Sequence, residues 1–285
     1  MVTPLLTIVT PTLNAMDTVA RTIECVASLS ATNSARDSAK NSATNTPVTQ
    51  TIQHIVVDGG STDGTLQYLQ EQRSIQLLCQ TGQGISQAIN QGIASAQGNF
   101  IAVLNADDYY LDDIKQVLTI LEQDSADNLN NTVYCANAIL YDPLSNTDIK
   151  REAQPNQMPY FMSVYHPSLF VPKKVHDQFG NYDETYRLAM DCEFVHRLMA
   201  NKVQLQHLPY TTSCMQLRGT SHVNHVRAMG EFEQSVIHHG LLSANKARYY
   251  RIRQTILHSM LRSPLCQRIW LKLRRLTPKS SAKII

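Results

Sequence analysis

Short apolar runs alternate with segments of helical periodicity along the first half of the chain. The runs predict buried strands at 5–9, 52–57, 75–79, 100–104 and 132–140. Between them, apolar residues that recur every three or four positions predict helices at 16–26, 66–72, 84–96 and 112–123. Such alternation is typical of an α/β fold in which helices cover both faces of a mostly parallel sheet.

The pattern changes in two other parts of the chain. Residues 30–51 are dominated by Ser, Thr, Asn and Ala, and we expect a flexible polar insertion there. Beyond about residue 150 the alternation weakens, although a strand at 166–171 and a helix at 186–199 are still predicted. These changes divide the chain into a domain at 1–225 and a basic amphipathic helical tail at 226–285.

Basic residues are concentrated at the C-terminal end of the chain. Residues 241–285 carry 11 of the 25 Lys and Arg, and no Asp or Glu follows Glu233. Apolar stripes between basic residues favour an interfacial helix on the anionic inner face of a membrane, with Trp270 as an anchor. The alternatives are packing on the acidic body or a dimer contact. We expect no nucleic-acid partner.

Composition also indicates the compartment. The six cysteines contain no CxxC pair, which argues against a zinc site or a disulfide framework and favours reduced thiols in the cytoplasm. No basic segment of the signal-peptide kind opens the chain, and no apolar run reaches 18 residues. We therefore expect a cytoplasmic protein without a membrane-spanning helix, in peripheral contact with the membrane at most.

Acidic side chains follow two of the predicted strands. Asp58 could accept a hydrogen bond from a nucleobase or ribose, or it could close an Asx turn eased by Gly59 and Gly60. Asp63 is the better candidate for a helix cap. Asp107 and Asp108 could hold a hard cation that in turn holds a diphosphate, or they could form a solvated turn or helix cap.

A second group of candidates lies in the other half of the chain. Asp191 and Glu193 sit among apolar residues of a predicted helix, where a partly buried carboxylate suits a general base. The alternative is a surface acid paired with Arg187 or Arg197. Three histidines are weaker candidates for metal or phosphate contacts: His166, His222 and His225.

Two nucleotide-binding fingerprints are excluded. Gly82-Gln83-Gly84 follows a predicted strand and opens a helix, but the last glycine of a dinucleotide motif is replaced by Gln87. The chain also contains no GxxxxGK[ST] segment and hence no P-loop.

Taken together, the ordered segments resemble family 2 glycosyltransferases with the GT-A fold, over about residues 5–222. The branch that builds O-antigen, colanic acid and other bacterial exopolysaccharides is the most similar. The segments that carry the resemblance are Thr10–Asn14, Val56–Thr65, Gly84–Ile93, Leu104–Asp108, His166-Pro167, Met190–Phe194 and Gly219–Ser221.

The resemblance implies an inverting transfer from a nucleotide-sugar donor, with a UDP-sugar as the first choice, to a saccharide or lipid-linked acceptor. It places the nucleotide-sugar contacts at Pro11, Thr12, Asn14, Asp58, Asn105 and Asp108. Asp107 would bind Mg²⁺ or Mn²⁺, with His222 as a further ligand, and Asp191 would be the catalytic base.

The chain departs from the family pattern in two ways. The first acid of the DxD motif is Asn105, and the 30–51 segment is longer than the usual link. A sugar-nucleotide pyrophosphorylase is an alternative, but Thr10–Asn14 lacks the glycine-rich basic loop of that class. A non-catalytic scaffold that kept the fold is another, and Asn105 keeps it open.

Overall fold

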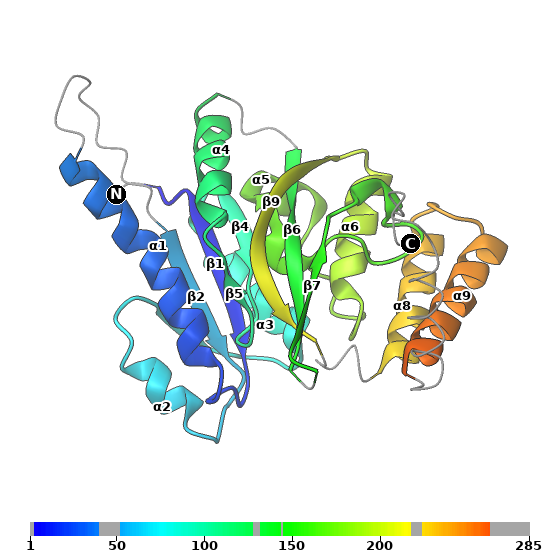
Figure 1. The fold of residues 1–285 in the computed structure, drawn as a ribbon, viewed down its shortest axis with the longest axis horizontal. Coiled ribbons are helices and arrows are strands. Elements are labelled where there is room, and N and C mark those ends of the chain that lie inside the picture. The colour runs from blue at the N-terminus through cyan, green and yellow to red at the C-terminus, as the bar shows by residue number, and fades with distance from the viewer. Residues whose placement is uncertain (1–2, 40–51, 128–131, 144, 218–223, 263–285) are drawn as a thin grey trace.

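Among the residues that the structure describes, nine strands form one mixed sheet at the centre of the fold (Figure 1). The computed structural model describes residues 3–39, 52–127, 132–143, 145–217 and 224–262. Four strands pair in parallel in the order β3-β2-β1-β4. Their bounds are Leu6–Thr12 (β1), Ile52–Asp58 (β2), Gln76–Cys79 (β3) and Phe100–Val103 (β4). Each coincides with one of the predicted apolar runs, so this half of the sheet is the one that the sequence pattern encodes most directly.

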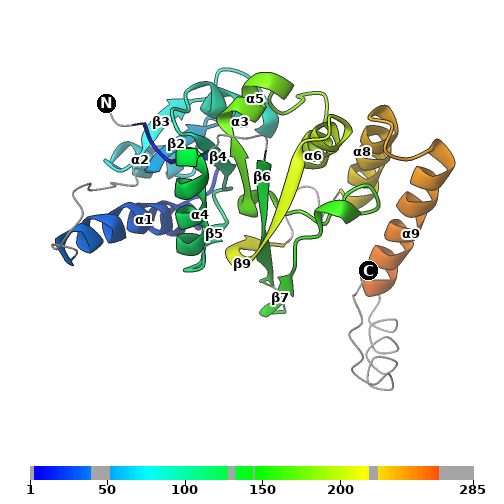
Figure 2. The same ribbon diagram turned by 90° about the horizontal axis from the view of Figure 1, so that it is seen from above.

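Helices cover both faces of the parallel strands, as predicted (Figure 2). The four helices of this half are α1 (Val19–Ala39), α2 (Thr65–Gln70), α3 (Ile85–Ala94) and α4 (Ile114–Asp127). Alternate residues of β1 point to opposite faces. Ile8 therefore joins the core cluster beneath α1 and α4, while Val9 joins the cluster beneath α3. At Gly92, α3 lies so close to β1 that an added Cβ would stand 2.4 Å from Val9 Cγ1.

The second half of the sheet is not parallel throughout. Its strands are β5 (Tyr109–Tyr110), β6 (Thr132–Asp142), β7 (Thr147–Arg151), β8 (Leu169–Pro172) and β9 (Gln204–Gln216). Strand β8 joins the two halves by pairing antiparallel with both β4 and β6, whereas β6 and β9 are parallel. The α/β prediction is thus confirmed, and the sheet is mixed beyond β4.

The remaining helices lie beside this second half. They are α5 (Lys173–Phe179), α6 (Met190–Ala200), α8 (His225–His238) and α9 (Ala244–Arg262), with 3₁₀ turns at Pro155–Gln157 and His166–Ser168. Helix α8 packs on α6, and its Phe232 belongs to the same core cluster as Phe194 of α6. The tail predicted from residue 226 therefore begins with a helix that is part of the folded body.

Three predicted elements differ from the observed ones. Residues 30–39, expected to be loop, continue α1, in which Ala31, Ala35 and Ala39 recur at helical spacing. The strand expected at 166–171 begins only at Leu169, because Pro167 lies in a 3₁₀ turn. The helix expected from residue 186 begins at Met190. The rest of the predicted insertion, 40–51, lies outside the described residues.

Across the described ranges, none of the helices combines the length and the apolar character that crossing a membrane requires. Trp270 and the rest of 263–285 lie outside those ranges.

Candidate active site

A pocket of about 720 Å³ opens where β1 and β4 end and α3 and α6 begin. Residues 11–15 at the end of β1 and 105–107 after β4 form one side of it. Gly84 and Ile85 at the start of α3, and Asp191 of α6, contribute the others. The carboxyl ends of parallel strands are where open α/β sheets bind ligands, so the position matches the expectation from the sequence.

Backbone N–H groups and polar side chains join the loop after β1 to the loop after β2. The amide N–H of Asn14 donates to Ser61 Oγ at 2.9 Å, and Asn14 Oδ1 accepts from the N–H of Thr62 at 2.9 Å. Asp63 accepts from the N–H of Met16 and from that of Thr65, the first residue of α2. These bonds hold the 11–15 segment, including Pro11 and Thr12, against the pocket.

Asp58 lies behind this wall rather than in the pocket lining. Its buried carboxylate accepts the N–H groups of Gly60 and Ser61 at 2.9 Å each, and the Ser61 hydroxyl at 2.5 Å. Both oxygens therefore close the turn, as in the Asx-turn alternative. The nucleobase contact of Asp58 stays a prediction.

The two acids after β4 occupy different depths. Asp107 lines the pocket, and burial raises the pKa of its carboxyl group. Asp108 is buried behind it, where burial and then the neighbouring Asp107 raise its pKa well above the ordinary value. Asp108 Oδ1 accepts the N–H of Gln216 at 3.0 Å, whereas Oδ2 has no hydrogen-bond partner among the described residues. Asp108 is thus not placed to touch a ligand directly.

A divalent cation fits at Asp107, with the buried Asp108 adding negative charge behind it. Mg²⁺ binds through one or two carboxylates and fills its other positions with phosphate oxygens and water. Burial disfavours the charged forms of Asp107 and Asp108, and a bound cation would stabilise those charges. The described residues contain no group of three or more His, Cys, Asp or Glu able to hold a metal by themselves, and His222 lies outside them.

His166 connects the acids after β4 with the predicted base. Its Nε2 atom lies 2.9 Å from Asn105 Nδ2 and 3.8 Å from Asp108 Oδ2, and its Nδ1 atom lies 3.9 Å from Asp191 Oδ2. Burial lowers the pKa of the imidazole, which favours the neutral ring. An amide nitrogen can only donate, so we assign the ring proton to Nδ1, on the side of Asp191. Asn105 thus supplies a donor that an acid in its place would lack when ionised.

Asp191 stands at the second position of α6 and lines the pocket, with 19% of its side chain exposed. Its Oδ1 atom accepts the N–H of Cys192, the next residue of the helix, at 2.8 Å. Glu193 differs: it is buried, forms two hydrogen bonds with Arg197, and contacts His239 at 3.0 Å. Asp191 is therefore the acid that faces the pocket, whereas Glu193 is held in contacts within the folded body.

Among the described residues that line the pocket, Arg187 is the one with a basic Lys or Arg side chain. Its side chain lies against the start of α3, where a Cβ on Gly84 would stand 2.9 Å from its Nη1 atom. The sequence suggested Arg187 only as a partner for an acid, and it assigned His166 little weight. His225 stacks on His258 and does not line the pocket.

Comparisons with known proteins agree with this architecture. The model of the family described as glycosyl transferase family 2 matches residues 7–161. No curated protein sequence gives a significant match.

Among solved structures, S. aureus TarS 1-349 in complex with UDP is 14% identical with a TM-score of 0.59, over 87% of this chain and 69% of that one. Its complex with UDP-GlcNAc is equally similar, at 14% identity and TM-score 0.59 over 87% and 70%. A longer TarS structure is 13% identical with a TM-score of 0.56, over 92% and 44%. At this identity, the likeness shows a shared fold.

Proposed function

The chain belongs to glycosyl transferase family 2, and we propose that it is an inverting, metal-dependent enzyme that transfers a sugar from a nucleotide-sugar donor to a saccharide or lipid-linked acceptor. The observation that carries the proposal is that Asp107 and Asp191 line the same pocket. His166 lies between the two segments, 3.8 Å from Oδ2 of Asp108, the residue after Asp107, and 3.9 Å from Oδ2 of Asp191. Acids from two distant segments suit the two ends of a displacement: one near the leaving diphosphate, the other near the attacking hydroxyl.

Several residues that line the pocket would each have a separate role in the transfer. Mg²⁺ or Mn²⁺, held by Asp107, would neutralise the charge that develops on the leaving diphosphate. Arg187, which also lines the pocket, would contact phosphate oxygens of the donor. Asp191 takes the proton of the acceptor hydroxyl as the new glycosidic bond forms. The neutral His166 ring lies beside Asp191, with its Nδ1 atom 3.9 Å from Asp191 Oδ2, and does not itself transfer the proton.

We propose a UDP-sugar, carrying a hexosyl or N-acetylhexosaminyl group, as the donor. Support comes from TarS, which shares the fold and is described in complex with UDP and with UDP-GlcNAc. Pro11, Thr12 and Asn14 line the pocket on the side where the nucleotide would lie. We keep bacterial surface polysaccharide synthesis as the proposed setting, on the motifs that resemble that branch.

A thermal-shift screen of UDP-, GDP- and dTDP-sugars, each with and without Mn²⁺, tests the proposal. We expect UDP-sugars to raise the melting temperature, and only with the metal. Hydrolysis of the stabilising donor would follow from the catalytic assignment. A protein that no nucleotide-sugar stabilises would contradict the proposal. Binding without any hydrolysis or transfer would favour the non-catalytic scaffold.

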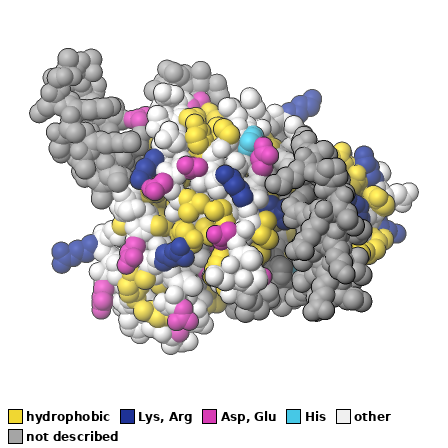
Figure 3. All heavy atoms as spheres, viewed as in Figure 1, with side chains coloured by type: hydrophobic (Ala, Val, Ile, Leu, Met, Phe, Trp, Pro, Cys, Tyr) yellow, Lys and Arg dark blue, Asp and Glu magenta, His cyan; other side chains and the backbone are white. Residues whose placement is uncertain are grey.

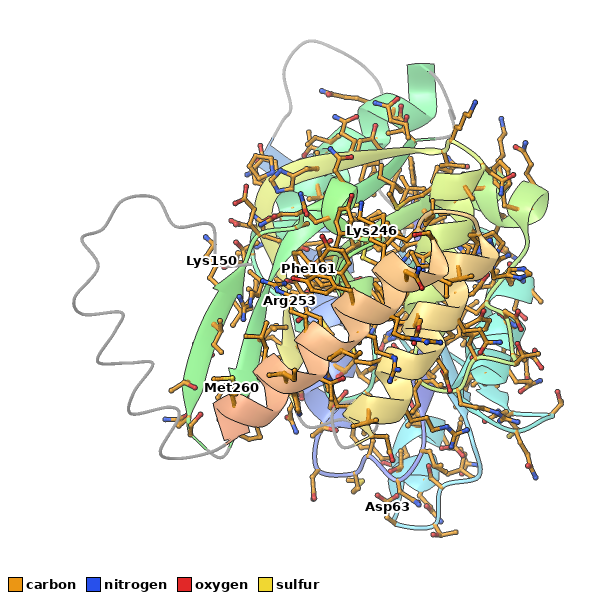
Figure 4. The ribbon with its side chains drawn as sticks, turned by 90° about the vertical axis from the view of Figure 1, so that its right-hand side faces the viewer. Asp63, Lys150, Phe161, Lys246, Arg253 and Met260 are labelled. Atoms are coloured by element: carbon orange, nitrogen blue, oxygen red, sulfur yellow. The ribbon has the colours of Figure 1, made fainter. Side chains whose placement is uncertain are left out.

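We also propose that helix α9 contacts an anionic membrane surface. Four apolar residues of α9 are exposed at helical spacing: Tyr249 (60%), Ile252 (47%), Ile256 (53%) and Met260 (50%). Hydrophobic and basic side chains lie together at the right-hand edge of the face in Figure 3, and Figure 4 shows Lys246, Arg253 and Met260 along the helix. A lipid-linked acceptor would give this contact a use.

The double substitution Ile252→Glu and Ile256→Glu should abolish this contact. We expect the unmodified protein to sediment with phosphatidylglycerol vesicles more than with phosphatidylcholine vesicles, and the double variant to stay in the supernatant, because buried apolar area drives the binding. Ile149→Glu, at an apolar residue of β7 that is 39% exposed, is the control. Equal sedimentation of the double variant and the control would refute the role of α9.

A further inference from the structure

The carboxylate of Glu231, on α8, holds the backbone of the loop that leads into α6. Glu231 Oε2 accepts the N–H groups of three consecutive residues: Arg187 at 3.0 Å, Leu188 at 2.7 Å and Ala189 at 3.0 Å. Consecutive N–H groups that converge on one point form an anion-binding concavity, which is here filled by a side chain of the protein itself. The loop conformation therefore depends on a residue more than 40 positions away.

This loop carries two parts of the pocket. Arg187 and Leu188 line it directly, and Ala189 is the N-cap of the helix on which Asp191 is the second residue. The 187–189 backbone thus sets where the Arg187 side chain and the start of α6 lie. Hydrogen bonds from N–H to a carboxylate are stronger than neutral ones, so three on one oxygen hold the loop firmly.

The surroundings of Glu231 indicate that its charge serves the loop. Only 14% of its side chain is exposed, and its ion pair with Arg227 is long, at 3.8 Å between Nε and Oε1. Its neighbour Glu233 is buried to the same degree, at 15% exposure, yet it contacts Arg248 and Arg251 of α9 instead. Two acids on one helix therefore face different partners, and only Glu231 faces the pocket loop.

We propose that Glu231 is a positioning residue for the donor pocket, acting through the 187–189 backbone on Arg187 and on the start of α6. The inference rests on the proposed function and assigns to α8 a part in the site that lies outside the residues matched by the family model. Helix α8 would then be a required component of the active site.

Glu231→Ala and Glu231→Gln test the proposal, with Glu233→Ala as the matched control. Hydrogen exchange of the 187–189 amides should be at least about tenfold faster in Glu231→Ala, because the hydrogen bonds that protect them are lost. Exchange in Glu231→Gln should lie between that and the unmodified protein, because the amide oxygen still accepts. Glu233→Ala should leave it unchanged. Unchanged exchange in Glu231→Ala would overturn the proposal.

Binding of UDP with Mn²⁺, measured by calorimetry, separates positioning from simple stabilisation. We expect Glu231→Ala to weaken the affinity by about tenfold, the scale of one charge-assisted contact. Adding Arg187→Ala should then cost little more, because both changes remove the same contact. Fast loop exchange with full UDP affinity would overturn the proposal. If the unmodified protein fails to bind UDP, the proposed donor is wrong, and the exchange result alone decides whether Glu231 holds the loop.

Discussion

Replacing Asp191 with Asn should lower the rate of sugar transfer or donor hydrolysis by about 10²–10⁴-fold, the range typical of general-base catalysis. Asn has nearly the same shape as Asp and keeps an oxygen that can accept the N–H of Cys192. It cannot take a proton from the acceptor hydroxyl. The rate of UDP release from a UDP-sugar, measured at saturating donor, reports the loss.

The affinity for UDP should change little in Asp191→Asn, because the base contacts the acceptor side of the reaction. Asp177→Asn is the control: Asp177 is an exposed residue of α5 that pairs with Lys173 at 2.9 Å. An Asp191→Asn enzyme that keeps the full rate would show that another group is the base, while leaving the donor pocket intact.

Replacing Asp107 with Ala, or removing the metal with a chelator, should reduce the rate by about 10²-fold or more, since Lewis-acid stabilisation of a leaving group is worth several kcal/mol. The Asp107→Ala enzyme should respond weakly to added Mn²⁺, whereas the unmodified enzyme should recover fully. Rates measured across a Mn²⁺ titration compare the two.

Asp107→Ala should not lower the stability of the metal-free protein. Asp108 is buried beside Asp107. Burial raises the pKa of both carboxyl groups, and repulsion by the neighbouring Asp107 raises that of Asp108 further. Removing one of two adjacent carboxylates relieves this repulsion. A melting temperature equal to or above that of the unmodified protein is expected without metal.

A fully active enzyme in the presence of chelator would refute the metal-dependent part of the mechanism.

The parallel half of the sheet and its site residues could be predicted because their signals are local. Each of β1, β2 and β4 is an apolar run that ends in polar residues, and parallel strands bring those ends to one edge. Pro11, Asn105 and Asp107 therefore meet as expected. Strand β9 gave a poor signal, because its first six residues contain only two apolar side chains, Leu205 and Leu208, and end in Pro209.

The parts of the site that depend on tertiary partners could not be predicted in the same way. His166 is a single histidine in sequence, and its importance comes from lying between Asn105 and Asp191. Glu231 looks like one of several acids on an amphipathic helix until its oxygen is seen to accept three N–H groups. At Asp58 the same strand-end signal also fits the turn that its carboxylate closes, and the ligand contact stays a prediction.

The most direct test of the central claim is a crystal structure of the protein with UDP and Mn²⁺. We predict that the diphosphate lies in the pocket between β1, β4 and α6, and that an oxygen of Asp107 coordinates the metal. Arg187 should contact the phosphates, and Asp191 should face the open side beyond them. A nucleotide bound elsewhere, or a metal held without Asp107, would contradict the account.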